Sequence, residues 1–313
     1  MKSFYLYIFT MVVVLGISSC RKVLDVDIEE KDKKIVANSL FNTDSVIRVH
    51  LSKSKGILED DYNIELIQNA QIDLFEDNQL IESLTNHGSG IYKSNIIPQQ
   101  NKTYKIWINV PDMQSAYADA YLPTAPEILQ LDTLTKTIHY SDQFNAGYDV
   151  EAFTASMKFK DPPGKNYYMV TTRIINTYTD NYGTYRYDYY TMVNTDDPAL
   201  ADQSYQMNMS DLSALVFSDE LFDNSTYDLA LYIERYNLSM GHNTVIFSLS
   251  NISEEMFYYT VSYFMENNSD GPFSEPVIVY NNINGGFGIF AGYSADTTSV
   301  SFEITYNDDD WIP

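Results

Sequence analysis

The stretch Tyr104-Lys105-Ile106-Trp107-Ile108-Asn109-Val110 decides the fold class of this chain. Its residues Tyr104, Ile106, Ile108 and Val110 alternate with Lys105, Trp107 and Asn109, and this period of two is typical of a strand with one buried face. Residues 47–52 and 70–75 alternate in the same way, and turn-forming sequence separates the three stretches. The pattern predicts an all-β domain over residues 34–122, of the immunoglobulin-like or transthyretin-like kind.

A second β-rich segment follows a short connector. Two prolines, Pro123 and Pro126, favour extended backbone and predict a boundary between domains. Beyond it, strands are predicted near 153–159, 167–175, 185–193, 227–236 and 244–249. The sequence Asp180-Asn181-Tyr182-Gly183 predicts a hairpin turn between the second and third of these strands. The second β-rich domain is therefore expected to span residues 127–313.

One stretch of this second domain predicts a helix near 253–267. Ser253 is a suitable N-cap, and Glu254 and Glu255 favour the first turn. Phe257, Val261, Phe264 and Met265 follow at helical spacing, so one face is apolar. The predicted fold class is thus mainly β, with two β-sandwich-like domains, the second carrying one short amphipathic helix.

The amino terminus predicts export and lipidation. A basic start is followed by an apolar run over residues 4–17, which is shorter than the roughly 17 to 25 residues of a membrane span. Ile17-Ser18-Ser19-Cys20 resembles the bacterial lipobox, in which the cysteine thiol is diacylated, so residues 1–20 are predicted to be a lipoprotein signal peptide. Several acyl chains on Cys20 give stable anchoring in the lipid bilayer. Cys20 is the only cysteine, so no intramolecular disulfide is possible.

The residues after Cys20 indicate the destination. Arg21 replaces the aspartate that retains enteric lipoproteins in the inner membrane, so the outer membrane is expected. Residues 21–33 form an acidic tether, and their acidic residues resemble surface-export signals of Bacteroidota lipoproteins. Without the signal, 18 Lys and Arg oppose 43 Asp and Glu, a net charge of 18 − 43 = −25. Such a charge excludes nucleic acid as a partner.

A glycine-rich loop carries a family resemblance. The segments Gly271-Pro272-Phe273-Ser274-Glu275-Pro276 and Tyr280 to Phe290 resemble the carboxyl-terminal signature of a Bacteroidota outer-membrane lipoprotein family, domain of unknown function 4249. Residues 70–74, 90–92, 117–126 and 161–168 agree with the same family, so the resemblance covers nearly all of the chain after the signal peptide. It implies an outer-membrane lipoprotein, often encoded beside a TonB-dependent receptor, without established enzymatic activity or cofactor.

The glycines of that loop also have an interpretation of their own. Gly285 and Gly286 suit a tight turn, and Gly288 suits a bulge or the close approach of another backbone. Ligand contact is the alternative. The loop is not a nucleotide-binding loop, because it lacks the Gly-x-Gly-x-x-Gly spacing and a basic residue for phosphate.

Catalytic and metal-binding patterns are weak. His50, His87, His139 and His242 lack metal-ligand spacing, and His87-Gly88-Ser89-Gly90 lacks the context of a hydrolase nucleophile. The acidic pairs and runs at 60–61, 196–197 and 308–310 lack the spacing of a calcium loop, so solvated surface acids are the favoured interpretation. We therefore expect neither a metal nor a catalytic site.

The best candidate for binding is the tyrosine-rich hairpin. Tyr185, Tyr187 and Tyr189 share one face of a strand, whereas Arg186 and Asp188 point the other way. Tyrosine offers a rigid apolar face with a hydrogen-bonding tip, which suits glycans, peptides or protein partners. A face covered by neighbouring elements is the alternative.

The leading hypothesis is a non-enzymatic accessory subunit of a TonB-dependent transport system, partnered by a β-barrel receptor. A self-standing surface adhesin for glycans or proteins is the second, and a hydrolase with an unrecognised site the third.

Overall fold

The computed structural model of the 313-residue chain describes residues 32–56, 59, 63–140, 148–200, 204–209, 212–267, 269 and 277–305. Contacts divide the chain into two units, Met1–Asp32 and Lys33–Pro313, and nearly all described residues belong to the second. The predicted signal peptide, Cys20 and most of the tether lie outside the described residues. The same holds for residues 271–276 and for the acidic residues at 60–61 and 308–310.

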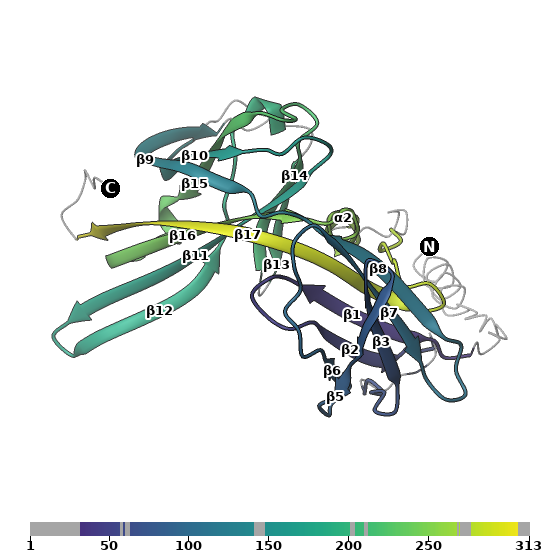
Figure 1. Ribbon diagram of the computed structural model, residues 1–313. Helices are drawn as coiled ribbons and strands as arrows, with labels where there is room; N and C mark the ends of the chain where they lie inside the picture. Colours follow the sequence, from purple (N-terminus) through teal and green to yellow (C-terminus); the bar gives the residue numbers. More distant parts are fainter. Residues whose placement is uncertain are drawn as a thin grey trace, which may run out of the picture. The chain divides into compact units, whose positions relative to one another are not determined.

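The largest sheet of the described chain has ten strands in the order β13-β14-β11-β16-β17-β1-β2-β6-β5, with β12 paired to β11 beside this path (Figure 1). Its strands are β1 (Ile35–Phe41), β2 (Arg48–Lys53), β5 (Thr85–Asn86), β6 (Ile91–Lys93), β11 (Tyr167–Asp180), β12 (Gly183–Thr191), β13 (Ser204–Met209), β14 (Leu212–Ser218), β16 (Gly241–Ile252) and β17 (Phe287–Ile304).

Two smaller sheets complete the β structure of the described residues. The first has the order β4-β3-β7-β8, with β3 (Gln71–Glu76), β4 (Gln79–Ser83), β7 (Lys102–Asn109) and β8 (Ala116–Leu122). The second has the order β15-β10-β9, with β9 (Glu127–Tyr140), β10 (Tyr148–Lys160) and β15 (Thr226–Glu234). Two short 3-10 helices occur at η1 (Pro198–Leu200) and η2 (Arg235–Asn237).

Strand β17 joins the two halves of the long sheet. Its first residues pair in parallel with β1, from Val36 opposite Phe287 to Phe41 opposite Gly292. Its remaining residues pair antiparallel with β16, from Tyr293 opposite Ile252 onward. The carboxyl-terminal strand thereby completes a sheet that begins with the first strand of the chain, a contact that the predicted boundary near residue 123 does not include.

Two hydrophobic cores lie between the long sheet and the smaller sheets. The first is built from residues 35–122 and includes Ile283 and Phe290 from the carboxyl-terminal segment. The second contains buried residues of β10 and β15 together with β11, β14 and β16. Buried and exposed residues alternate along β7, where Tyr104, Ile106 and Ile108 are fully buried. The predicted mainly β fold is therefore confirmed.

The predicted helix is also confirmed, as α2 (Glu254–Asn267). The Ser253 hydroxyl accepts a hydrogen bond from the Met256 N–H at 3.3 Å, which satisfies one unpaired donor of the first turn. The buried face consists of Met256, Phe257, Thr260 and Val261. It packs in a third cluster with residues of β11, β14 and β17. Met265, expected on the apolar face, is 42% exposed because the buried stripe is centred one turn earlier.

Candidate functional site

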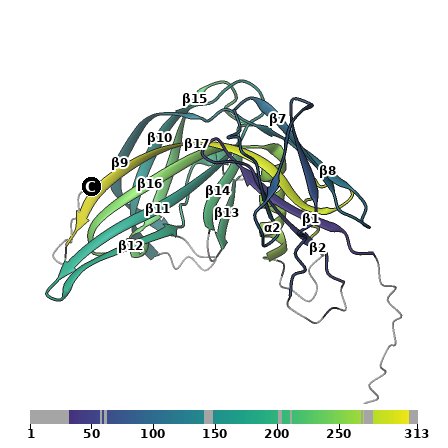
Figure 2. The same cartoon turned by 60° about the horizontal axis from the view of Figure 1, so that its bottom comes forward.

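The hairpin of β11 and β12 carries the tyrosines that the sequence predicted as a binding surface. Asp180 holds its turn, because one carboxylate oxygen accepts hydrogen bonds from the N–H groups of Tyr182 at 2.8 Å and Gly183 at 3.1 Å. The register places Tyr185 opposite Tyr178, Tyr187 opposite Asn176 and Tyr189 opposite Ile174. Figure 2 shows β12 beside β11 at the margin of the curved sheet.

The three predicted tyrosines lie on one face of β12, but their surroundings differ. Tyr189 is half-buried against the second core, and its hydroxyl donates to the carbonyl of Asn237 at 3.1 Å. Tyr187 is 53% exposed and Tyr185 is 40% exposed. The face therefore starts at the core and continues outward as an accessible aromatic surface. We call Tyr185, Tyr187 and Tyr189 the tyrosine face.

The opposite face of the hairpin is polar. Arg173 donates to both carboxylate oxygens of Asp188, through Nε at 2.6 Å and Nη2 at 2.5 Å. This pair holds the pKa of Asp188 below its ordinary value, mainly through the hydrogen bond from Arg173. Arg186 is exposed on the same face, and Tyr190 is 51% exposed. A two-point guanidinium–carboxylate contact fixes the two strands in one register.

The glycines of the signature loop lie where other backbone comes very close. A Cβ on Gly286 would lie 2.4 Å from the carbonyl oxygen of Ile35, and one on Gly288 would lie 2.1 Å from that of Ala37. Gly285 has a positive φ of 80° and approaches the Ser115 carbonyl in the same way. The arrangement allows β17 to enter the sheet beside β1, so close backbone contact accounts for all three residues.

Two hollows lie beside the first turn of α2, and segments far apart in the sequence line them. One, of about 370 Å³, is polar and is lined by Asp119, Glu255 and residues 280–284. The other, of about 300 Å³, includes Tyr121, Pro123, Lys165, Tyr167 and Glu254. The segments 117–126, 161–168 and 280–290, which carry the family resemblance, supply most of the lining of the first hollow and half of the lining of the second, whose other half is residues 251–255. The tertiary structure thus brings these separate segments to one place.

The side chains around these hollows are already engaged with one another. The Tyr167 hydroxyl donates to Glu254 at 3.0 Å, and the Lys165 ammonium lies 5.0 Å from the centre of the Tyr167 ring. Burial raises the pKa of Glu255, with a smaller contribution from Glu254 and Asp119. Oxygen atoms that line the hollows can accept hydrogen bonds from a small polar ligand. The contacts among the lining side chains do not indicate a chemical reaction.

An acidic cluster, which sequence reasoning missed, is formed by the buried Asp161 and Asp219 and the exposed Asp223. Asp161 and Asp219 are each 1% exposed. Asp161 accepts from the Tyr168 hydroxyl at 2.5 Å and from the Asn224 N–H at 2.7 Å. Burial raises the pKa of Asp161 to about 6. Asp161 stands next to Pro162 and Pro163, but its partners follow some sixty residues later, so no local spacing reveals them.

Carboxylates so arranged are of the type that calcium prefers. In this cluster, however, donors of the chain occupy them: Asn166 donates to Asp219 through its backbone at 2.9 Å and its side chain at 3.0 Å, and Gly164 donates to Asp223 at 2.9 Å. The cluster therefore serves to tie the loop at 161–166 to the loop at 219–225. It is the one group of three acidic, histidine or cysteine residues at ligand distance in the described chain.

The histidines are separate from this cluster. His242 lies 3.5 Å from Glu303 on an exposed part of the long sheet, His50 is half-buried in β2, and His87 is exposed in a loop. The His139 side chain lies outside the described residues. Ser89, next to His87, has a positive φ of 52° in a tight turn.

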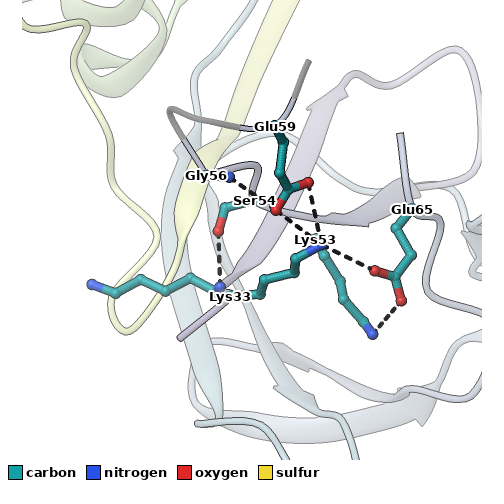
Figure 3. A network of polar contacts seen from close by, with 7 residues as sticks. Lys33, Lys53, Ser54, Gly56, Glu59 and Glu65 are labelled. Atoms are coloured by element: carbon teal, nitrogen blue, oxygen red, sulfur yellow. Dashed lines mark hydrogen bonds and ion pairs between the residues drawn. The ribbon is translucent and has the colours of Figure 1, made fainter. Parts of the chain in front are cut away.

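An exposed ionic network lies where the described chain begins (Figure 3). Lys33 pairs with Glu59 at 3.2 Å and with Glu65 at 3.5 Å, and Lys53 also pairs with Glu65. The Glu59 hydrogen bond raises the pKa of Lys33, and the Lys53 hydrogen bond lowers that of Glu65. Because exposed ion pairs contribute little stability, we expect the network to add little to the free energy of folding.

These features define a mainly β protein with an exposed aromatic hairpin face and two hollows beside its helix. The chain belongs to the family described as domain of unknown function, DUF4249, whose family model matches residues 21–299. This confirms the family predicted from the glycine-rich loop. A search of curated proteins finds no match. Among the described residues, no helix combines the length and apolar character that crossing a bilayer requires.

Proposed function

We propose that this chain is a non-enzymatic, lipid-anchored outer-membrane protein that holds a partner protein through its tyrosine face. Tyr185 and Tyr187 support the proposal, because both rings are about half exposed at the margin of a large sheet. Tyr189 anchors the base of this face in the core. Large rigid side chains on a fixed backbone lose little entropy on binding, so they suit a protein interface.

The anchor in this proposal is acylated Cys20. Its support is the lipobox resemblance of residues 17–20 and the tether at 21–33. Incorporation of labelled palmitate into the full chain tests it. We expect label in the natural chain and loss of both label and membrane association in Cys20→Ala. Equal labelling of the two chains would contradict the anchor.

The partner in this proposal is the β-barrel receptor of a TonB-dependent uptake system. Its support is the family membership together with the expected outer-membrane location. An accessory subunit needs a stable contact surface rather than a reaction centre. The tyrosine face is such a surface, and its register is fixed from the other side of the hairpin by Arg173 and Asp188.

Affinity purification from mildly solubilised outer membranes tests this function. We expect the natural chain to recover the receptor and the double variant Tyr185→Ala, Tyr187→Ala to lose it. Tyr190→Ala is the matched control, because Tyr190 is 51% exposed on the other face of the same strand. Thermal unfolding of each variant checks that the fold persists.

The possible outcomes separate the parts of the proposal. Recovery of no β-barrel by the natural chain would reject the transport role. Equal recovery by the double variant would keep the partner but reject the tyrosine face. Retention of a glycan in place of a protein would favour the adhesin hypothesis.

A further inference from the structure

In the described chain, strand β12 is a long edge strand without proline, lysine or a bulge. In the described chain its strand neighbour is β11, and the pairing runs from Asp180 opposite Gly183 to Thr172 opposite Thr191 without a register shift. Its nine residues, Gly-Thr-Tyr-Arg-Tyr-Asp-Tyr-Tyr-Thr, contain neither proline nor lysine. Proteins normally blunt such edges with proline, lysine or bulges, because an open edge offers unpaired N–H and C=O groups to another strand.

Four other sheet margins of the described chain, those at β4, β9, β8 and β15, are bulged or partly bridged. The shift between Leu74 and Phe75 leaves Ile81 of β4 unmatched, so this five-residue edge strand bulges. The shift between Lys158 and Phe159 leaves Leu129 of β9 unmatched in the same way. Isolated bridges cover part of β8, through Tyr117 and Asn284, and part of β15, through Tyr232 and Asn194. Strand β12 differs from these four margins, and it is longer than β13, the six-residue strand at the end of the same sheet that also has no bulge, proline or lysine.

The sequence of β12 is complementary to itself. If two copies pair antiparallel about a two-fold axis at Tyr187, Arg186 of each copy lies opposite Asp188 of the other. Tyr187 then meets its own counterpart, and Tyr185 lies opposite Tyr189. Opposite charges and aromatic pairs at directly opposed positions stabilise antiparallel strands, and a two-fold interface requires this kind of self-complementarity.

The charge of the hairpin permits such an approach. The whole chain has a formal charge of −24, which opposes contact between most of its surfaces. Residues 167–191 carry two basic residues, Arg173 and Arg186, and two acidic residues, Asp180 and Asp188, so their net charge is 2 − 2 = 0. Arg173 holds Asp188 in place while the carboxylate keeps further acceptor sites for a second cation.

We propose that two copies of this chain pair through their β12 edges, antiparallel about Tyr187, so that the long sheet continues from one copy into the other. The interface uses the backbone edge of β12 and the opposed Arg186 and Asp188, and it also places residues of the tyrosine face side by side. Variants of Arg186 and Asp188 leave the tyrosine face unchanged, so a failure of this pairing can be distinguished from a failure of the receptor contact.

Charge exchange tests the pairing in the full chain. Two differently tagged copies are expressed together, solubilised in mild detergent and purified through one tag. We expect the natural chains to copurify, whereas Arg186→Asp alone and Asp188→Arg alone each lose copurification, because like charges then face each other. Copies carrying Arg186→Asp and copies carrying Asp188→Arg should copurify together, since both opposed pairs are again of opposite sign.

The mixed pair also controls for damage to the hairpin, because a misfolded variant could not be rescued by another. Failure of the natural chains to copurify would overturn the proposal. So would a mixture that copurifies no better than either variant alone, because the association would not then depend on the opposed pair.

Disulfide cross-linking tests the axis. Two copies of Tyr187→Cys place their cysteines directly opposite, at a Cα separation of about 5 Å that suits a disulfide. Tyr190→Cys is the control: residue 190 lies opposite Thr184, so the two cysteines are six residues apart along the strands, about 20 Å. We expect cross-linked dimer from Tyr187→Cys and background levels from Tyr190→Cys and from the natural chain with Cys20 alone. Equal cross-linking at both positions would overturn this register.

Discussion

The side chain of Asn282 forms hydrogen bonds with both the N–H and the carbonyl group of Phe290. Its Nδ2 donates to the Phe290 carbonyl at 2.7 Å, and its Oδ1 accepts from the Phe290 N–H at 2.9 Å. Phe290 lies in the part of β17 that pairs with β1, beyond the last residue paired with β16. One amide thus replaces a neighbouring strand at this point. The contact holds the buried Phe290 ring against Phe41, with ring centres 4.7 Å apart.

Replacement of Asn282 by Ala should therefore weaken the joint between the two halves of the sheet. Two hydrogen bonds to a buried segment are lost, so we expect the free energy of unfolding to fall by roughly 2 kcal/mol. Urea unfolding measures the change. Asn284→Ala in the same loop is the control, because its side chain makes one long contact of 3.5 Å. A similar loss in both variants would show that the loop, rather than the Phe290 contact, matters.

Replacement of Gly288 by Ala should be more damaging. Its φ is +112°, and a Cβ would lie 2.1 Å from the Ala37 carbonyl oxygen. Gly164→Ala has the same backbone problem, with a φ of +99°, but meets no atom within 4 Å. Backbone strain costs about 1 to 3 kcal/mol in each variant, and the clash adds to it at Gly288. We expect a clearly larger drop in the unfolding midpoint for Gly288→Ala, and equal drops would refute close packing as the reason for this glycine.

The acidic cluster predicts a pH dependence of stability. Native Asp161 keeps its proton up to a pKa of about 6, whereas an aspartate of the unfolded chain loses it near pH 4. Between these values the native state binds more protons, so stability falls as the pH rises, by up to about 3 kcal/mol for this one group. Unfolding in urea from pH 4 to pH 7 measures the slope.

Asp161→Asn should flatten this slope, since the group no longer titrates. Tyr168→Phe should extend the fall in stability to higher pH, because the Tyr168 hydroxyl favours the ionised carboxylate and its loss raises the native pKa of Asp161 further. Asp112→Asn removes the same charge from an exposed turn and serves as the control. A slope equally steep in Asp161→Asn and the natural chain would exclude Asp161 as its source.

The N-cap of α2 predicts a modest effect at one hydroxyl. Ser253→Ala removes the acceptor for the Met256 N–H and should lower the free energy of unfolding by about 1 kcal/mol. Ser253→Thr keeps the hydroxyl and should lose less. Thermal unfolding compares the two, and an equal loss would point to the size of the buried residue instead of the cap.

Local patterns predicted the local elements well, for reasons visible in particular residues. Ile72 and Leu74 alternate with polar neighbours, and both are fully buried in β3. The turn at 181–182 and the start of α2 follow from short-range hydrogen bonds of Asp180 and Ser253. The tyrosine face also follows from alternation alone. Alternation could not predict how exposed each tyrosine side chain is. Tyr187 and Tyr189 differ in exposure because the second core ends between them.

The sequence by itself determined the β character of the chain, the α-helix α2, its hairpin and its family, because each depends on residues close together in the chain. Only the tertiary structure decided that β17 joins β1, that Asn282 replaces a strand beside Phe290, that Asp161 meets Asp219, and that β12 lies at an edge of the described sheet. These contacts join residues from about eight to more than 250 positions apart, and they depend on sheet order. No local period encodes that order, because one strand can satisfy its backbone beside any suitable partner.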